Sequence, residues 1–372
     1  MNKLVIANLL HRPLRSLISI TAVAIEVIMI LSIVGIFMGM LNDQKQRTNG
    51  IGADLMMRAS NTSVMNGVGG ATLSLKIVDV LQKLPHVTVV APATWHMNTE
   101  GSIELVYGID YPSFNALRPF TFVSGGQFTG PNDAIVDDVF ASSSNPQTGK
   151  LYAVGDTISI VNQPFRISGI FEHGKGGRKL IPLETMNSLT GSAGKASIFY
   201  IKSDDPENDQ AVIDEIHAVK GLKDYPVQTM QEWMTEMTPD KIPGFNLALR
   251  VITGIAVIVG FLVIFQSMYT AVLERTREIG ILKSLGSSKM TIVSVVVRET
   301  AVMAVAGVLL GIVGTYLVKV VLLRAFPTQH FEITTEWIVR GALIAFVGAL
   351  MGALYPAWMA ARKDPIDALA YE

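Results

Sequence analysis

A short charged segment, residues 274–298, lies between two long apolar stretches of the sequence. Within it, apolar side chains recur at helical spacing and define one face of a helix, while charged side chains fill the rest of its surface. The apolar positions are Ile279, Leu282 and Leu285, and the charged ones are Glu274, Arg275, Arg277, Glu278 and Lys283. A helix of this kind, anchored at each end, can receive a mechanical push and pass it on. A solvated loop between membrane helices is the alternative interpretation.

The end of this predicted helix is marked by Gly286, which can adopt the left-handed backbone conformation that stops a helix. Either Ser287 or Ser288 can then cap the next helix, which continues into an apolar stretch. The pattern therefore predicts a helix, a sharp stop and a second helix that runs into the membrane.

Side chains that could catalyse a reaction do not form a set. The sequence contains neither a nucleophile elbow nor an HExxH pattern. Asp137 and Asp138 are adjacent and therefore point apart, which makes them a poor acid–base pair. Four histidines are scattered and lack the spacing of a metal site: His86, His96, His173 and His217. We therefore expect no metal site and no enzymatic activity in this chain.

The segment 174–179, GKGGRK, invites comparison with a phosphate-binding loop. It lacks the GxxxxGK[ST] spacing, and no apolar helix follows it. We interpret it as a flexible basic loop.

Four stretches are long and apolar enough to cross a membrane, at 17–41, 251–273, 300–318 and 341–361. Apolar residues make up 49% of the chain and charged residues 16%, with a net charge of −1. A nucleic-acid partner is not expected, because there is no basic excess to neutralise phosphates. Cysteine is absent, which excludes disulfides and thiolate metal sites.

Basic residues flank the spans asymmetrically, and the positive-inside rule then places both termini and the charged segment in the cytoplasm. These residues are Lys3, Arg12, Arg15, Arg275, Arg277, Lys283, Lys289, Arg298, Arg362 and Lys363. The first span exceeds the length of a signal-peptide core, so we expect it to remain as an anchor.

The fold class that follows is an α-helical membrane protein with four transmembrane helices and a large α+β extracytoplasmic domain inserted between helices 1 and 2. We predict an amphipathic N-terminus at 1–16, spans at 17–41, 246–273, 299–323 and 337–361, the outer domain at 42–245, a coupling helix at 274–298, an outer loop at 324–336 and a C-terminal helix at 362–372. Within the outer domain, residues 122–194 resemble a subdomain inserted into a host formed by 42–121 and 195–245. Alternating runs at 157–161 and 165–170 predict a hairpin.

Small residues recur one turn apart in three spans, and such pairs let helix backbones approach closely. The pairs are Gly35 with Gly39, Gly307 with Gly311, and Gly348 with Gly352, which favours tight bundling or dimerisation. Glu26 is the one acid deep in a span, so it should face protein, water or a partner, or be protonated. It is either a substrate or proton site, or a hydrogen-bond partner of Gln266 or Ser267.

The charged segment resembles the coupling region of the FtsX-like permease family, which includes macrolide- and lipoprotein-exporting ABC systems. The resemblance rests on ERTREIGILK at 274–283, LG at 285–286 and RE at 298–299. NLL at 8–10, RSL at 15–17 and DPIDAL at 364–369 resemble the family's segments before span one and at the C-terminus. VGDTI at 154–158 and IPL at 181–183 resemble its periplasmic core.

The resemblance implies a dimer, of identical or paralogous chains, that binds two copies of an ABC ATPase. The expected ATPase-coupling residues are Glu274, Arg275, Arg277, Glu278, Ile279, Ile281, Leu282, Lys283, Leu285 and Gly286. ATP and Mg would be bound by the ATPase and no cofactor by this chain. Because span one starts near Leu17, we expect the ATPase to be a separate chain. A periplasmic adaptor and a bacterial inner-membrane location are also implied.

The function implied by the resemblance is export of a drug, lipid, lipoprotein or peptide, driven by movement of the outer domain. The alternative is a cell-division-type regulator that activates a cell-wall hydrolase without transport. A haem exporter and a membrane enzyme are further alternatives.

Overall fold

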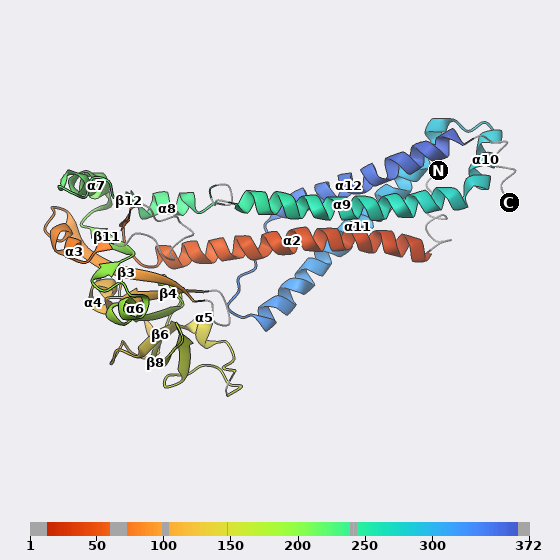
Figure 1. Ribbon diagram of the computed structural model, residues 1–372. Coiled ribbons are helices and arrows are strands. Elements are labelled where there is room, and N and C mark those ends of the chain that lie inside the picture. The colour runs from red at the N-terminus through yellow and green to blue at the C-terminus, as the bar shows by residue number, and fades with distance from the viewer. Residues whose placement is uncertain are drawn as a thin grey trace. The chain divides into compact units, whose positions relative to one another are not determined.

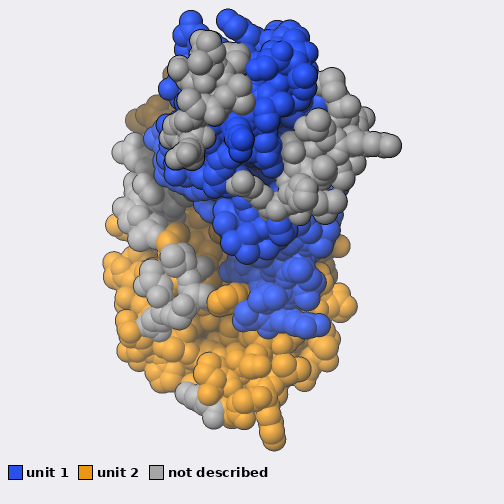
Figure 2. Space-filling model, turned by 90° about the vertical axis from the view of Figure 1, so that its right-hand side faces the viewer, with its two compact units in different colours: residues 1–39, 244–325, 329–372 blue, residues 40–243, 326–328 orange. Residues whose placement is uncertain are grey.

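The computed structural model describes residues 13–59, 73–98, 104–146, 148–238, 241 and 244–363. It divides into two compact units, which Figure 2 colours separately. The first comprises Met1–Gly39, Gly244–Ala325 and Gln329–Glu372, and the second comprises Met40–Pro243 and Phe326–Thr328. Most of the predicted amphipathic N-terminus and the C-terminal motif at 364–369 lie outside the described residues.

The first unit contains four long helices, labelled in Figure 1: α2 (Pro13–Asn49), α9 (Phe245–Glu274), α11 (Lys289–Ala325) and α12 (Thr335–Arg362). Each is long and apolar enough to span a membrane, which confirms the four predicted spans. From Met40 onward, the residues of α2 belong to the second unit. All four helices extend beyond the apolar stretches, because polar residues continue the helix past each end of the span.

Glycines allow these helices to pack closely. A Cβ added at Gly307 would lie 2.6 Å from Val23 Cβ, and one at Gly311 would lie 2.6 Å from Val27 Cβ, so α11 packs directly on α2. Gly352 lies in the same way against the Phe261 carbonyl of α9. The other predicted packing glycines also lie against this chain: Gly35 against the Phe331 ring, Gly39 against the His330 backbone, and Gly348 near Val257 and Glu26.

The second unit is built on a ten-stranded mixed sheet with the path β12-β1-β11-β3-β4-β9-β6-β8-β5, and β7 pairs with β8. Its strands are β1 (Leu55–Arg58), β3 (Val87–Asn98), β4 (Glu104–Ile109), β5 (Phe122–Gly125), β6 (Asp133–Asp137), β7 (Thr157–Ile160), β8 (Gln163–Phe171), β9 (Lys179–Pro182), β11 (Ile198–Ser203) and β12 (Val227–Thr229). The pairs β4–β9 and β6–β8 are parallel, and the others are antiparallel. Two short strands, β2 (Leu73–Ser74) and β10 (Lys195–Ala196), form a separate pair.

Helices cover both faces of this sheet: α3 (Lys76–Leu81), α4 (Tyr111–Leu117), α5 (Asp138–Ala141), α6 (Leu183–Thr190), α7 (Asp209–Ala218) and α8 (Met230–Glu236). Strand β11 shows why both faces are buried. Its side chains alternate, so Tyr200 joins a core with Phe114 of α4 and Trp233 of α8, while Phe199 joins a core with Ile216 of α7.

The predicted hairpin is confirmed as β7–β8. Its two-residue turn is Val161–Asn162, both with positive φ, rather than the expected 162–164. Pro164 instead lies in β8, opposite Ser159. Strand β9 belongs to the predicted inserted segment and pairs with β4 of the predicted host, so the segment continues the same sheet.

Candidate functional site

The charged segment forms a short helix, α10 (Thr276–Ser284), between α9 and α11. Gly286 has a φ of 92°. Its amide donates to the Lys283 carbonyl, and the Ser287 amide donates to the Leu282 carbonyl, both at 3.0 Å. These two bonds form a Schellman motif, which satisfies carbonyls at the end of the helix. The Ser288 hydroxyl accepts a hydrogen bond from the Thr291 amide at 3.2 Å and caps α11. The predicted stop and restart are therefore confirmed, and the second helix begins at Lys289.

Three ionic or polar contacts attach this junction to helices other than α9. The Arg275 guanidinium pairs with the Glu299 carboxylate of α11, with Nη1 and Oε2 3.2 Å apart. Lys283 Nζ donates to the Ala361 carbonyl at the end of α12, at 3.1 Å. Glu274, the last residue of α9, is paired with Arg15 of α2. Since α9 leads into α10 directly, the junction is attached to all four long helices.

Exposure divides the expected coupling residues into three groups. Ile279 is buried against the helix bundle, as are its neighbours Thr276 and Gly280 on α10. The exposed members are Glu274, Arg277, Glu278, Ile281, Leu285 and Gly286, and the partly exposed ones are Arg275, Leu282 and Lys283. Leu285 is 79% exposed and the nearby Met290 is 76% exposed. The apolar ridge predicted from 279, 282 and 285 is therefore divided, because Ile279 faces inward and Leu285 lies beyond the helix end.

A cavity of 260 Å³ lies in the angle between the ends of α9, α10 and α11. Its wall combines apolar side chains with the Arg275–Glu299 pair and Glu278. It is lined by Met268, Ala271, Val272, Arg275, Glu278, Ile279, Leu282, Ser287, Thr291, Ile292, Val295, Val296 and Glu299. Its apolar walls suit an inserted apolar side chain better than a small polar substrate.

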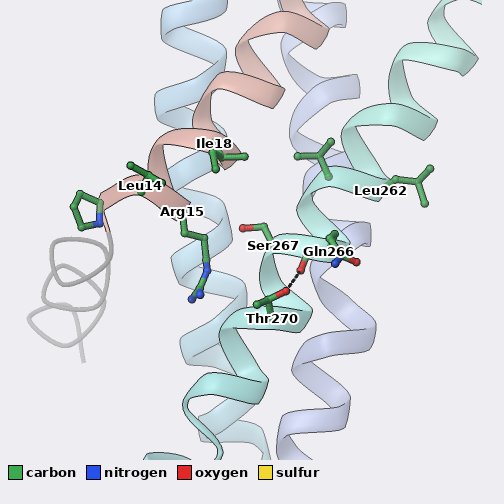
Figure 3. A pocket seen from close by; sticks show the side chains of 9 residues that line it. Leu14, Arg15, Ile18, Leu262, Gln266, Ser267 and Thr270 are labelled. Atoms are coloured by element: carbon green, nitrogen blue, oxygen red, sulfur yellow. Dashed lines mark hydrogen bonds between the residues drawn. The ribbon is translucent and has the colours of Figure 1, made fainter.

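Glu26 makes neither of the hydrogen bonds, to Gln266 or to Ser267, that one interpretation of the sequence offered. Its side chain is 3% exposed, and neither carboxylate oxygen has a hydrogen-bond partner among the described residues. The Ser267 hydroxyl is instead 2.7 Å from the Ser19 hydroxyl. Gln266 lines a groove of 600 Å³ between α2 and α9, where Figure 3 shows it with Arg15, Ile18 and Leu262. The carboxyl of Glu26 faces Gly260 of α9, whose missing Cβ leaves room for it.

The basic segment 174–179 is not a flexible loop. Lys175, Arg178 and Lys179 are all buried. The Gly176 amide donates to the Arg47 carbonyl of α2 at 2.8 Å, and Lys175 Nζ donates to the Arg118 carbonyl at 2.6 Å. Burial, together with repulsion from Arg118 and Lys202, lowers the pKa of Lys175 to about 8. The prediction of a flexible basic loop was wrong because backbone carbonyls and carboxylates from distant parts of the chain surround these basic side chains.

Two of the histidines and both of the aspartates considered from the sequence lie in separate pairs. His86 is 2.9 Å from Asp204, and this hydrogen bond raises the pKa of the imidazole. His173 Nδ1 is 3.0 Å from Asp138. Asp137 points elsewhere and pairs with Arg178 at 3.0 Å. Within the described ranges, no group of three or more potential metal ligands is found.

Comparison with known proteins agrees with this architecture. A family profile described as "MacB-like periplasmic core domain" matches residues 16–219, and one described as "FtsX-like permease C-terminal" matches residues 250–365. The first of these covers more than half of the chain. The chain is 27% identical to the macrolide export ATP-binding/permease protein MacB of Shewanella sp. (strain W3-18-1), over 97% of this chain and 59% of that protein.

The chain is also 26% identical to the uncharacterized ABC transporter permease YknZ of Bacillus subtilis (strain 168), over 100% of this chain and 98% of that protein. Among solved structures, the periplasmic region of MacB from Actinobacillus actinomycetemcomitans is similar with a TM-score of 0.39 and 14% identity, covering 51% of this chain and 94% of that one. The chain spans 59% and 49% of the length of the first two MacB relatives.

Four spanning helices with an α/β domain between the first and second define a multi-pass membrane protein of the ABC permease class. Together with the two matching profiles, they show that the chain belongs to the MacB/FtsX-type ABC transporter permeases.

Proposed function

We propose that the chain couples ATP hydrolysis in a separate ATPase subunit to movement of its α/β domain, and that this movement drives export of a substrate. The α10 junction would face the cytoplasm and dock on the ATPase, and the α/β domain would lie on the opposite side. A second permease copy would complete the transporter. The Bacillus relative is named a permease and is matched over 98% of its length, which supports an ATPase on another chain.

The attachment of the junction between α9 and α10 to all four long helices carries the proposal. Glu274, Arg275 and Lys283 reach α2, α11 and α12, so a displacement of this junction acts on the whole bundle at once. A solvated loop would not be joined to its neighbours in this way. The exposed apolar side chains of Leu285 and Met290 add a surface that suits a protein partner.

The orientation can be tested directly because the chain contains no cysteine. Single variants Ser284→Cys, at the end of α10, and Ser142→Cys, in the α/β domain, would each carry one thiol. In intact cells, a maleimide that cannot cross the cytoplasmic membrane should label Ser142→Cys. It should leave Ser284→Cys unlabelled until that membrane is permeabilised. The reverse labelling pattern would overturn the proposal.

Coupling is tested by replacing Arg277 and Glu278 together with alanine in the full chain co-expressed with an ABC ATPase. Both side chains are exposed, so we expect a folded permease that no longer retains the ATPase or stimulates its vanadate-sensitive hydrolysis. The matched control replaces Glu336 and Arg340, an exposed pair on α12, with alanine. Equal ATPase binding and stimulation by both variants would contradict the proposed coupling role.

A further inference from the structure

Arg178 occupies a junction of three chain segments within the second unit. Its Nη1 donates to Asp137 Oδ2 at the end of β6, at 3.0 Å. Its Nη2 lies 3.1 Å from each carboxylate oxygen of Asp43, near the end of α2, and 3.1 Å from the Thr328 carbonyl. The guanidinium thus joins the sheet, the end of α2 and the segment that connects α11 to α12.

Arg178 and the two carboxylates that it contacts are largely shielded from water. The Arg178 side chain is 8% exposed, and those of Asp43 and Asp137 are 13% and 1% exposed. Asp137 is also held by its own element, since its Oδ1 accepts from the Phe140 amide at 2.7 Å and caps α5. An ion pair between enclosed groups keeps one geometry, because breaking it would leave a buried charge without compensation.

A guanidinium suits this position better than an ammonium. It is planar, and its several N–H groups point in fixed directions, so one side chain can hold two carboxylates and a carbonyl at once. The backbone adds to this attachment. The Gly176 amide donates to Arg47 of α2, and the Gly174 carbonyl packs against Gly50, where a Cβ would overlap it.

Two of the segments that Arg178 holds continue along the chain into the helices of the first unit. Asp43 lies on α2, whose earlier residues form a spanning helix. Thr328 lies between α11 and α12. The third segment, at Asp137, belongs to the sheet. Arg178 is therefore placed where a displacement of α2 or of the α11–α12 connection would reach the sheet.

We propose that Arg178 is the positioning residue that transmits displacement of α2 and of the α11–α12 connection to the α/β domain. This inference rests on the proposed function and adds the residue through which the movement passes. It also gives a role to the basic segment 174–179, which is not a phosphate-binding loop.

The test measures movement of the α/β domain with one spin label at Ser142→Cys, after α5, in each of the two permease copies. The position is exposed, and no native cysteine competes for the label. The labelled full chain, in complex with its ATPase in nanodiscs, is compared without nucleotide and after trapping with ATP, magnesium and vanadate. In the otherwise unchanged chain, we expect a narrow distribution of distances between the two labels, which shifts on trapping because Arg178 makes the sheet follow α2.

Arg178→Gln should broaden this distribution and abolish the shift, while ATPase binding and hydrolysis remain. Arg178→Lys keeps the charge but not the planar fork, so it should restore part of the shift. The matched control is Arg166→Gln, which breaks a pair with Asp133 in the same domain, away from α2 and the α11–α12 connection. If Arg178 had only a structural role, Arg178→Gln and Arg166→Gln would both lower the unfolding temperature. Neither variant would then lose the shift while retaining ATP hydrolysis.

If Arg178→Gln fails to fold, Asp43→Asn provides the test. It weakens the contact of Arg178 with α2, together with the pair between Asp43 and Arg47 within α2. It should reduce the shift with the sheet intact, and a full shift in this variant would overturn the inference. A full shift in folded Arg178→Gln would also overturn it, while leaving the proposed function standing. Absence of any shift in the chain with Arg178 would instead contradict the proposed function.

Discussion

Arg275 Nη1 lies 3.2 Å from Glu299 Oε2, and this ion pair joins the residue before α10 to the side of α11. Their side chains are 13% and 9% exposed, so the pair is shielded from water. Arg275 therefore faces the bundle, whereas Arg277, in the first turn of α10, faces solvent. The two arginines, only two residues apart, are suited to different tasks: one fixes α10 to the membrane helices and the other is available to a partner.

Replacing Glu299 with alanine should lower the stability of the helix bundle, because Arg275 would keep a shielded charge without this carboxylate. Breaking a buried pair from one side costs roughly 3–5 kcal/mol. Thermal unfolding in detergent measures the loss. The exchanged variant Arg275→Glu with Glu299→Arg should recover part of it, and equal losses in the single and exchanged variants would show that the pairing is not the cause.

Leu285→Asp should leave the fold intact and weaken ATPase binding, because this side chain is 79% exposed. A comparable change at Leu151 of the α/β domain, which is 60% exposed, should affect neither property. Affinity of the detergent-solubilised permease for the ATPase, measured by surface plasmon resonance, separates the two variants. Unaltered affinity after Leu285→Asp would exclude this residue from the docking surface.

Gly260→Ala should disturb the packing of α9 on α2, because the new methyl group would overlap the carboxyl of Glu26. Overpacking of this kind costs about 1–3 kcal/mol. Adding Glu26→Ala should relieve the overlap and restore the unfolding temperature. Gly254→Ala on the same helix is the control, since nothing lies within 4 Å of a Cβ there. Additive effects of the changes at 26 and 260 would argue against this contact.

Lys175 predicts a defined dependence of stability on pH. Its pKa is about 8 in the folded protein, against an ordinary value of 10.5. Between these pH values the unfolded chain retains a proton that the folded chain has lost, so raising the pH through this window stabilises the fold. The unfolding temperature of the full chain, minus that of Lys175→Met, should therefore increase from pH 8 to 10.5. A flat or falling difference would contradict the lowered pKa.

Much of the architecture follows from the sequence because it depends on local composition. Long apolar stretches specify spanning helices wherever the chain places them. The backbone freedom of Gly286 and the hydroxyl of Ser288 define the stop after α10 and the start of α11 through contacts a few residues apart. The hairpin β7–β8 was predictable for the same reason, although its turn is Val161–Asn162 and not 162–164.

Tertiary structure alone decided what the polar side chains contact. Arg178 looked like one charge in a basic loop, yet residues 135 and 150 positions away in the sequence meet its guanidinium. A hydrogen bond from Glu26 to Gln266 or Ser267 was one interpretation of the sequence, but the packing of α9 places Gly260 against Glu26, and Ser267 instead bonds Ser19. Local patterns determine where helices and turns form, because their causes lie within a few residues. Partners of a buried charge depend on which distant segments fold together, and no local pattern specifies that.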